Sequence, residues 1–226
     1  MSVNCGCPAS SHLANLEIAD CKESFGQIQK VIIQRIYKET GVLNKIEHAD
    51  ITSKEKMMAL ASAANGTKII ISPYIQAPET EPGAARTFGG GNQTLSGIEI
   101  VIGREPTTFT GVMYQELQNV VATMKQYSCE NIGVYLIDEN GNIGALSNNK
   151  NNGRVLNSAG TGYRPIPIRS FFVGDKKLGG YEEPDSNAIS WSFVPNWSDD
   201  LVMIKASSLD YNPLTDLSNV STAAEM

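Results

Sequence analysis

Cysteine and histidine near the amino terminus are the first residues with metal-binding chemistry. Cys5 and Cys7 are separated by one residue, and His12 and Cys21 follow. Thiolate and imidazole groups bind zinc, but structural zinc sites normally combine two such paired motifs, and the second pair is missing. We therefore expect free thiols here and at Cys129, with no metal and no other cofactor.

Three consecutive glycines at positions 89–91 are a second candidate site, because glycine lets backbone N–H groups approach a phosphate. A phosphate-binding loop also needs a strand before the glycines, a Gly-Lys-Ser/Thr motif and the start of a helix. The sequence offers none of these beside the run. The glycines are predicted to form a loop hinge.

Asp138, Asn140 and Asn142 alternate as in a calcium-binding loop. Position 12 of that loop would be Asn149, which cannot supply the bidentate carboxylate that calcium needs. Because Asn140 precedes Gly141, the same residues fit a tight turn between two strands better. The sequence therefore predicts a β-hairpin.

Catalytic constellations are not recognisable in the sequence. The two histidines, His12 and His48, do not lie beside a nucleophile-elbow motif, and the scattered carboxylates define no glycosidase pair. We expect no catalytic residues and no enzyme activity, with a small hydrolase as the alternative. Six aromatic residues could line a ligand groove, but aromatic side chains on alternating strand positions are more typical of a core: Phe171, Phe172, Tyr181, Trp191, Phe193 and Trp197.

The composition indicates an ordinary globular chain. Of its 226 residues, 41% are hydrophobic, and 18 Lys and Arg against 24 Asp and Glu give a formal net charge of −6. The basic residues are dispersed, which argues against a protein that holds nucleic acid by its phosphates. The start of the chain lacks the basic and apolar regions of a secretory signal, so we expect synthesis in the cytoplasm and no membrane partner.

The hydrophobic pattern predicts mostly strands and two helices. A capping box at Thr52 and Glu55 begins a helix over residues 53–64, and apolar residues from Val112 to Met124 at helical spacing predict another over 111–128. Strands are predicted at 30–38, 68–75, 98–103, 131–137, 142–146, 165–173, 188–194 and 201–206. A long loop without regular structure is predicted at 76–97, and a second exposed loop at 147–163.

These elements predict a mainly β (α+β) fold. We expect one domain over residues 26–206, an antiparallel two-sheet sandwich or barrel with two helices and a projecting loop. An N-terminal arm (1–25) and a C-terminal arm (207–226) complete the chain.

The order of these features resembles the major tail tube proteins of long-tailed bacteriophages. The similarity extends from about Cys21 to Leu217. It is carried by four segments: RTFGGG from Arg86, CENIGVYLID from Cys129, FFVGDKKLGG from Phe171 and WSFVPNWSDDLV from Trp191.

The resemblance implies a structural virion protein without catalytic residues. Its copies would form rings, usually hexameric, that stack into a tail tube through which genomic DNA passes without specific binding. The arms and the long loop would contact the next subunit or ring, and other tail or connector proteins would be further partners. A heterologous contact that closes gives a ring, and one that does not close gives a filament. The alternative is another virion assembly protein, such as a capsid accessory, connector or fibre subunit.

Overall fold

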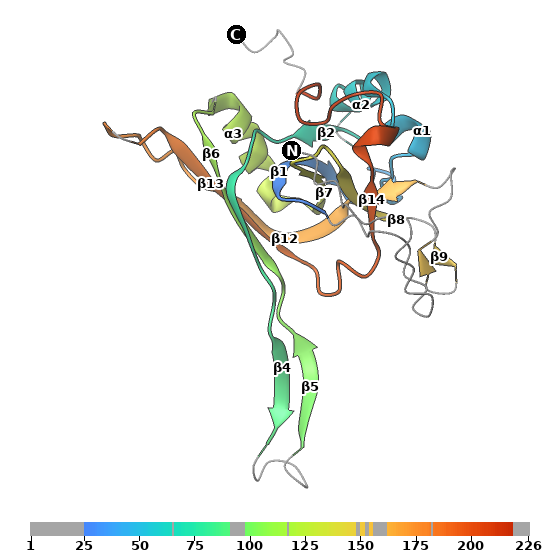
Figure 1. Ribbon diagram of the computed structural model, residues 1–226, viewed down its shortest axis with the longest axis vertical. Helices are drawn as coiled ribbons and strands as arrows, with labels where there is room; N and C mark the ends of the chain where they lie inside the picture. The colour runs from blue at the N-terminus through green and yellow to red at the C-terminus, as the bar shows by residue number, and fades with distance from the viewer. Residues whose placement is uncertain are drawn as a thin grey trace, which may run out of the picture.

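Antiparallel strands form most of the molecule in the computed structural model (Figure 1). The structure describes residues 25–64, 66–90, 98–116, 118–147, 150–151, 154–155, 162–181 and 183–218. Among these residues, ten strands form one curved sheet with the order β11-β8-β7-β12-β13-β6-β3, to which β1, β2 and β14 are added at β7 and β8. Every strand pair in it is antiparallel.

The strands of the large sheet are β1 (Ile28–Arg35), β2 (Ile69–Ile71), β3 (Gln76–Glu81), β6 (Thr108–Tyr114), β7 (Ile132–Asp138), β8 (Ile143–Ser147), β11 (Tyr163–Arg164), β12 (Ile166–Val173), β13 (Ser186–Phe193) and β14 (Leu201–Ile204). Two further pairs are β4 (Ala85–Gly89) with β5 (Glu99–Arg104), and β9 (Lys150–Asn151) with β10 (Arg154–Val155). The predicted mainly β fold is confirmed.

The sheet curls until its two halves face each other across one apolar core. Val31 of β1 and Val134 of β7 share this core with Phe109 of β6 and Trp191 of β13. Trp191 stacks on Phe109 with ring centroids 4.0 Å apart, and it meets Phe193 edge-on. The predicted alternation in β13 is confirmed, because Ile189, Trp191 and Phe193 are buried while Ser190 and Ser192 are half-buried.

A second apolar core lies on the other face of β1, β2, β7 and β8. The helices α1 (His48–Ile51) and α2 (Lys54–Ala61) cover it with Ile51 and Met57. The helix predicted at 53–64 is therefore confirmed. Its capping box does not form: the Lys54 N–H donates to Asp210 Oδ1 instead, and Thr52 Oγ1 donates to the His48 carbonyl.

Part of the predicted C-terminal arm packs against this second core. Tyr211 and Leu217 are buried, and the Tyr211 hydroxyl donates to the Ile51 carbonyl. Lys30 Nζ and the Tyr74 hydroxyl both donate to the Leu214 carbonyl, at 2.6 and 2.9 Å. Residues 219–226 lie outside the described residues, as does the predicted N-terminal arm except Phe25.

The turn between β7 and β8 forms as the sequence predicts. The Asp138 carboxylate is buried and accepts the backbone N–H groups of Gly26, Asn140 and Asn142, and also the Asn142 side-chain amide. Gly141 has φ of 80°, a left-handed conformation that glycine adopts without strain. Asp138 therefore organises a hairpin turn.

The helix predicted at 111–128 is wrong over its first residues. Residues 111–114 belong to strand β6, and helix α3 spans only Gln118–Gln126. In β6 the inward positions are Phe109, Gly111 and Met113. Because Gly111 occupies the middle inward position, the apolar alternation of β6 is weak in the sequence. Val112 could therefore be assigned to the helical spacing that continues at Val121 and Met124.

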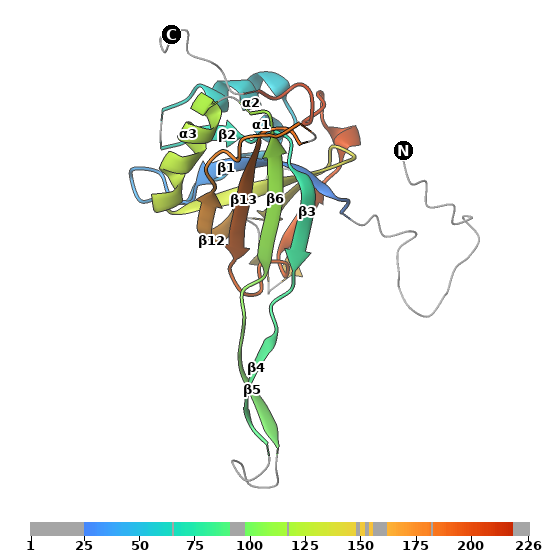
Figure 2. The ribbon, with the colours of Figure 1, turned by 90° about the vertical axis from the view of Figure 1, so that its left-hand side faces the viewer.

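The loop predicted at 76–97 is also wrong as irregular structure. Its residues 76–81 form β3 and 85–89 form β4, which pair with β6 and β5, while residues 91–97 lie outside the described part of the chain. Pro78 is tolerated because β3 lies at the end of the sheet order, where fewer ladder hydrogen bonds are needed. The strands escaped prediction because apolar periodicity reports burial, and most of these residues are exposed. The projection of this segment is visible in Figures 1 and 2.

Within the described part of the chain, no helix combines the length and apolar character needed to cross a membrane.

Candidate assembly surfaces

The projecting hairpin, formed by β4 and β5, is the most unusual surface of the molecule. It extends from the end of β3 and β6, away from the rest of the sheet (Figures 1 and 2). Phe88 lies opposite Ile100, and Thr87 lies opposite Val101. Phe88, Ile100 and Ile102 are 54%, 55% and 66% exposed, and Ile98 and Val101 are similarly exposed.

These side chains are costly to leave in water. Fully burying an Ile or Phe side chain stabilises a structure by about 1.5–3 kcal/mol, so this group offers a large gain to any partner that covers it. A two-stranded hairpin is also only marginally stable alone in water. Contiguous exposed apolar residues of this kind typically mark a contact surface.

The root of the projecting hairpin is fixed by backbone contacts. The Glu105 N–H donates to the Ala84 carbonyl at 2.8 Å, and a Cβ atom built on Gly83 would overlap the Glu105 carbonyl oxygen. Arg104 donates to Asn196 Oδ1 at 3.1 Å, which ties β5 to the loop between β13 and β14. Only glycine at position 83 lets these two backbone segments of the hairpin root approach this closely.

We expect Gly83→Ala to loosen this root. The new methyl group meets backbone rather than a movable side chain, at a cost of about 1–3 kcal/mol. Backbone amides of β4 and β5 should then exchange with solvent about tenfold faster in hydrogen-exchange measurements, while those of β7 stay protected. Gly103→Ala is the matched control, because a Cβ there has no atom within 4 Å. Equal protection in both variants would contradict the assignment.

An open sheet face lies on β12, β13, β6 and β3. Figure 2 shows these strands side by side with no described helix in front of them. Outward side chains on the two middle strands are mostly small hydroxyl residues: Ser190 pairs with Thr110, and Ser192 with Thr108. At the edge, Glu79 lies opposite Thr110 and Glu81 opposite Thr108.

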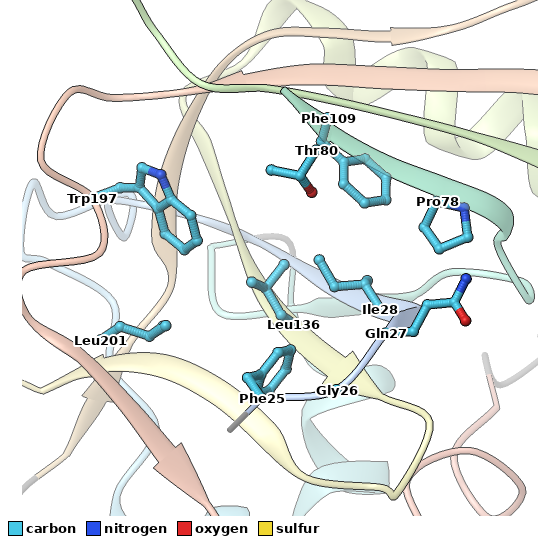
Figure 3. Close-up of a pocket in the computed structure, with 10 residues that line it drawn as sticks. All are labelled: Phe25, Gly26, Gln27, Ile28, Pro78, Thr80, Phe109, Leu136, Trp197 and Leu201. Carbon is cyan, nitrogen blue, oxygen red and sulfur yellow. The ribbon is translucent and has the colours of Figure 1, made fainter. Parts of the chain in front are cut away.

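An apolar pocket of about 260 Å³ lies at the seam between β3 and the start of β1 (Figure 3). Its side chains point toward a common space, and they come from segments far apart in the sequence. The pocket is lined by Phe25, Gly26, Gln27, Ile28, Pro78, Thr80, Phe109, Leu136, Trp197 and Leu201. None of these side chains titrates, so the pocket suits an apolar group and offers no acid or base.

Burial shifts the pKa values of the ionisable groups Lys30 and Tyr135. Burial lowers the pKa of Lys30, with the Glu116 carboxylate acting in the opposite direction, and the ammonium lies 4.3 Å from the centre of the Tyr74 ring. Complete burial raises the pKa of Tyr135 well above its ordinary value. The Tyr135 hydroxyl donates to Gln34 Oε1, so its role is structural.

The residues first considered for chemistry are not brought together in the described part of the chain. Cys5, Cys7, Cys21 and His12 lie outside it, together with Gly91 and Asn149, while Cys129 is an exposed free thiol. His48 Nδ1 lies 2.9 Å from the Tyr163 hydroxyl. No metal-binding group of three or more His, Cys, Asp or Glu residues occurs among the described positions.

The structure also places the described glycines of the run and the six aromatic candidates. Gly89 ends β4, and the Glu99 carboxylate lies near Gly90, which opposes a phosphate there. Phe171, Trp191 and Phe193 belong to the core as predicted. Trp197 stacks on Phe193 at 4.2 Å and lines the apolar pocket, while Phe172 and Tyr181 are exposed.

No model of a known protein family matches the chain, and no curated protein matches its sequence. Among solved structures, it is similar to the tail of an empty GTA particle with C6 symmetry, at 11% identity and a TM-score of 0.32, over 57% of this chain and 81% of that chain. It is also similar to a crystal structure of an Hcp protein, at 11% identity and a TM-score of 0.22, over 73% and 88% of the two chains. Because the TM-scores are low, function is inferred from this chain's own surfaces.

Proposed function

We propose that the chain is a structural subunit that assembles with copies of itself into stacked rings, forming a tail tube of a virion. One observation carries this proposal: a two-stranded hairpin with apolar side chains on both faces projects away from the sheet that anchors it. The resemblance of the sequence to major tail tube proteins agrees with it.

Self-assembly follows from the placement of the projecting hairpin. Phe88 and Ile100 lie far out on the hairpin, beyond the root at Gly83 and Glu105, and neither belongs to the two cores. A single subunit therefore leaves them exposed. A second copy that covers them forms a heterologous contact, which repeats from subunit to subunit and builds rings or filaments.

The open sheet face is the surface that we assign to the lumen. Its serine and threonine hydroxyls carry no charge, Glu79 and Glu81 add two negative charges at one edge, and Arg169, opposite Ser192, adds a single positive charge. Phosphate groups are repelled by such a wall, whereas Lys and Arg contacts would bind DNA in a salt-dependent manner. Genomic DNA would then pass without specific binding, and the function requires no catalytic residue.

Other expected properties belong to the same proposal. The subunit would be made in the host cytoplasm, reside in the virion tail, and contact other tail or connector proteins at the ends of the tube. A connector, capsid accessory or fibre subunit is the alternative within the same class of assembly protein.

Negative-stain microscopy of the purified full-length chain, combined with light scattering, tests the proposal. We expect tubes of stacked rings whose formation rises with protein concentration. Discrete single rings would instead favour a connector. A chain that stays monomeric at every concentration would contradict self-assembly.

A further inference from the structure

We propose that the apolar pocket receives the projecting hairpin of a second copy of this chain. This inference rests on the proposed self-assembly and adds the receiving site. It names a donor surface, centred on Phe88 and Ile100, and an acceptor surface, centred on Thr80 and Trp197.

The pocket lies where the curled sheet fails to close. At one end of the seam the Ile75 N–H donates to the Gln29 carbonyl at 2.7 Å. Beyond that point Pro78 and Thr80 of β3 lie across the pocket from Gln27 and Ile28, as Figure 3 shows. The seam therefore leaves an apolar space open at the surface of the barrel.

The subunit's own hairpin cannot fill this space. The hydrogen bond from Glu105 to Ala84 and the one from Arg104 to Asn196 fix its root. Both ribbon views show the hairpin leading away from the barrel (Figures 1 and 2). The hairpin that enters the pocket must therefore come from another copy.

The two surfaces match in chemistry. Phe88 lies opposite Ile100 on one face of the hairpin, and the exposed side chains of Ile98 and Ile102 lie two residues before and after Ile100 in the sequence. The pocket lining is almost entirely apolar. Contact would remove both surfaces from water at the same time, which is the main driving force for association.

The acidic side chains of β3 do not belong to the pocket. Glu79 and Glu81 lie opposite Thr110 and Thr108 on the open sheet face, whereas Thr80 lies opposite Phe109 and lines the pocket. The contact between hairpin and pocket therefore rests on their apolar side chains.

A charge placed in the pocket mouth tests the acceptor surface. Thr80 is exposed in the monomer, so Thr80→Glu should fold normally, yet it would place a carboxylate against the incoming apolar hairpin. We expect the protein concentration needed for half-maximal assembly to rise at least tenfold. Thr123→Glu, the same change at an exposed position of α3, is the matched control and should assemble like wild type.

A cross-link identifies the occupant. The background carries serine at the four native cysteines, and a small photoreactive maleimide is attached to Thr80→Cys. A labelled minority is then assembled with an excess of unlabelled chain. We expect the cross-linked peptide to contain residues from 85–104 of an unlabelled copy. Tubes with cross-links to any other segment, or a Thr80→Glu variant that assembles normally, would overturn the inference and leave the proposed function intact. Wild-type chain that forms no assembly would overturn both.

Discussion

Deleting residues 85–104 is expected to give a folded monomer that no longer assembles. The ends left by the deletion are already adjacent, because the Glu105 N–H donates to the Ala84 carbonyl, so an Asn-Gly turn can join them. Neither core contains a residue of the projecting hairpin. We therefore expect the free energy of unfolding to change by less than about 1 kcal/mol, while tubes disappear from electron micrographs.

Point substitutions separate the effect of the apolar side chains of Phe88 and Ile100 from the effect of the hairpin's length. Phe88→Ser with Ile100→Ser keeps both strands and should abolish assembly as the deletion does. Thr87→Ser lies on the opposite face and serves as the control, with assembly expected to be unchanged. Normal tubes from the deletion variant would refute the role of the hairpin. A deletion over 79–92 would be a poorer test, since it would also remove part of β3.

Truncating Trp191 is expected to have the largest effect on stability. The side chain is 1% exposed and contacts Phe109, Phe171 and Phe193 between the two halves of the sheet. Trp191→Ala leaves a cavity in the core and should lower the free energy of unfolding by about 3–5 kcal/mol, a large share of the 5–15 kcal/mol typical of a domain. Urea denaturation followed by circular dichroism measures the loss.

Two variants serve as controls for this substitution. Trp191→Phe should lose less, because it keeps an aromatic ring and removes an indole N–H that has no partner among the described residues. Phe172→Ala, on the neighbouring strand, removes a side chain that is 57% exposed and should change stability little. Equal losses at Trp191 and Phe172 would show that the aromatic core does not hold the halves together.

The strands that the sequence predicts well are those that bury at least one face. In β13 the alternation of Ile189, Trp191 and Phe193 reports burial directly, and in β7 and β8 the continuous apolar runs and the Asn140-Gly141 turn do the same. β3 is hydrogen-bonded to β6 and β4 to β5, while most of their side chains stay exposed. The sequence therefore shows no apolar periodicity there. The helix predicted to begin at residue 111 was wrong for a related reason. Gly111 has no side chain, so the apolar alternation on the inward face of β6 is interrupted in the sequence.

The candidate surfaces were less accessible to sequence reasoning. The projecting segment was predicted from its glycines and prolines, but its β structure was not, and its contact with another subunit stays a prediction. The apolar pocket combines residues as distant as Phe25, Pro78 and Leu201. Only the curl of the sheet brings them together, because Leu136 and Phe109 belong to opposite halves. The hydrophobic pattern of the sequence cannot show that residues so far apart in the chain lie side by side.

The projecting hairpin and the apolar pocket are different surfaces of one subunit, and this difference gives an assembly built from them a direction. One end of the tube would present free hairpins and the other would present empty pockets. The two ends would therefore add subunits at unequal rates. A cap that supplies only a hairpin-like strand pair would fill the empty pockets and stop growth at that end. A nucleating protein that supplies only pockets would hold the free hairpins of the first subunits, so growth would proceed at the same pocket end. Polarity of growth thus follows from the placement of Phe88 and Trp197 on separate parts of the same fold.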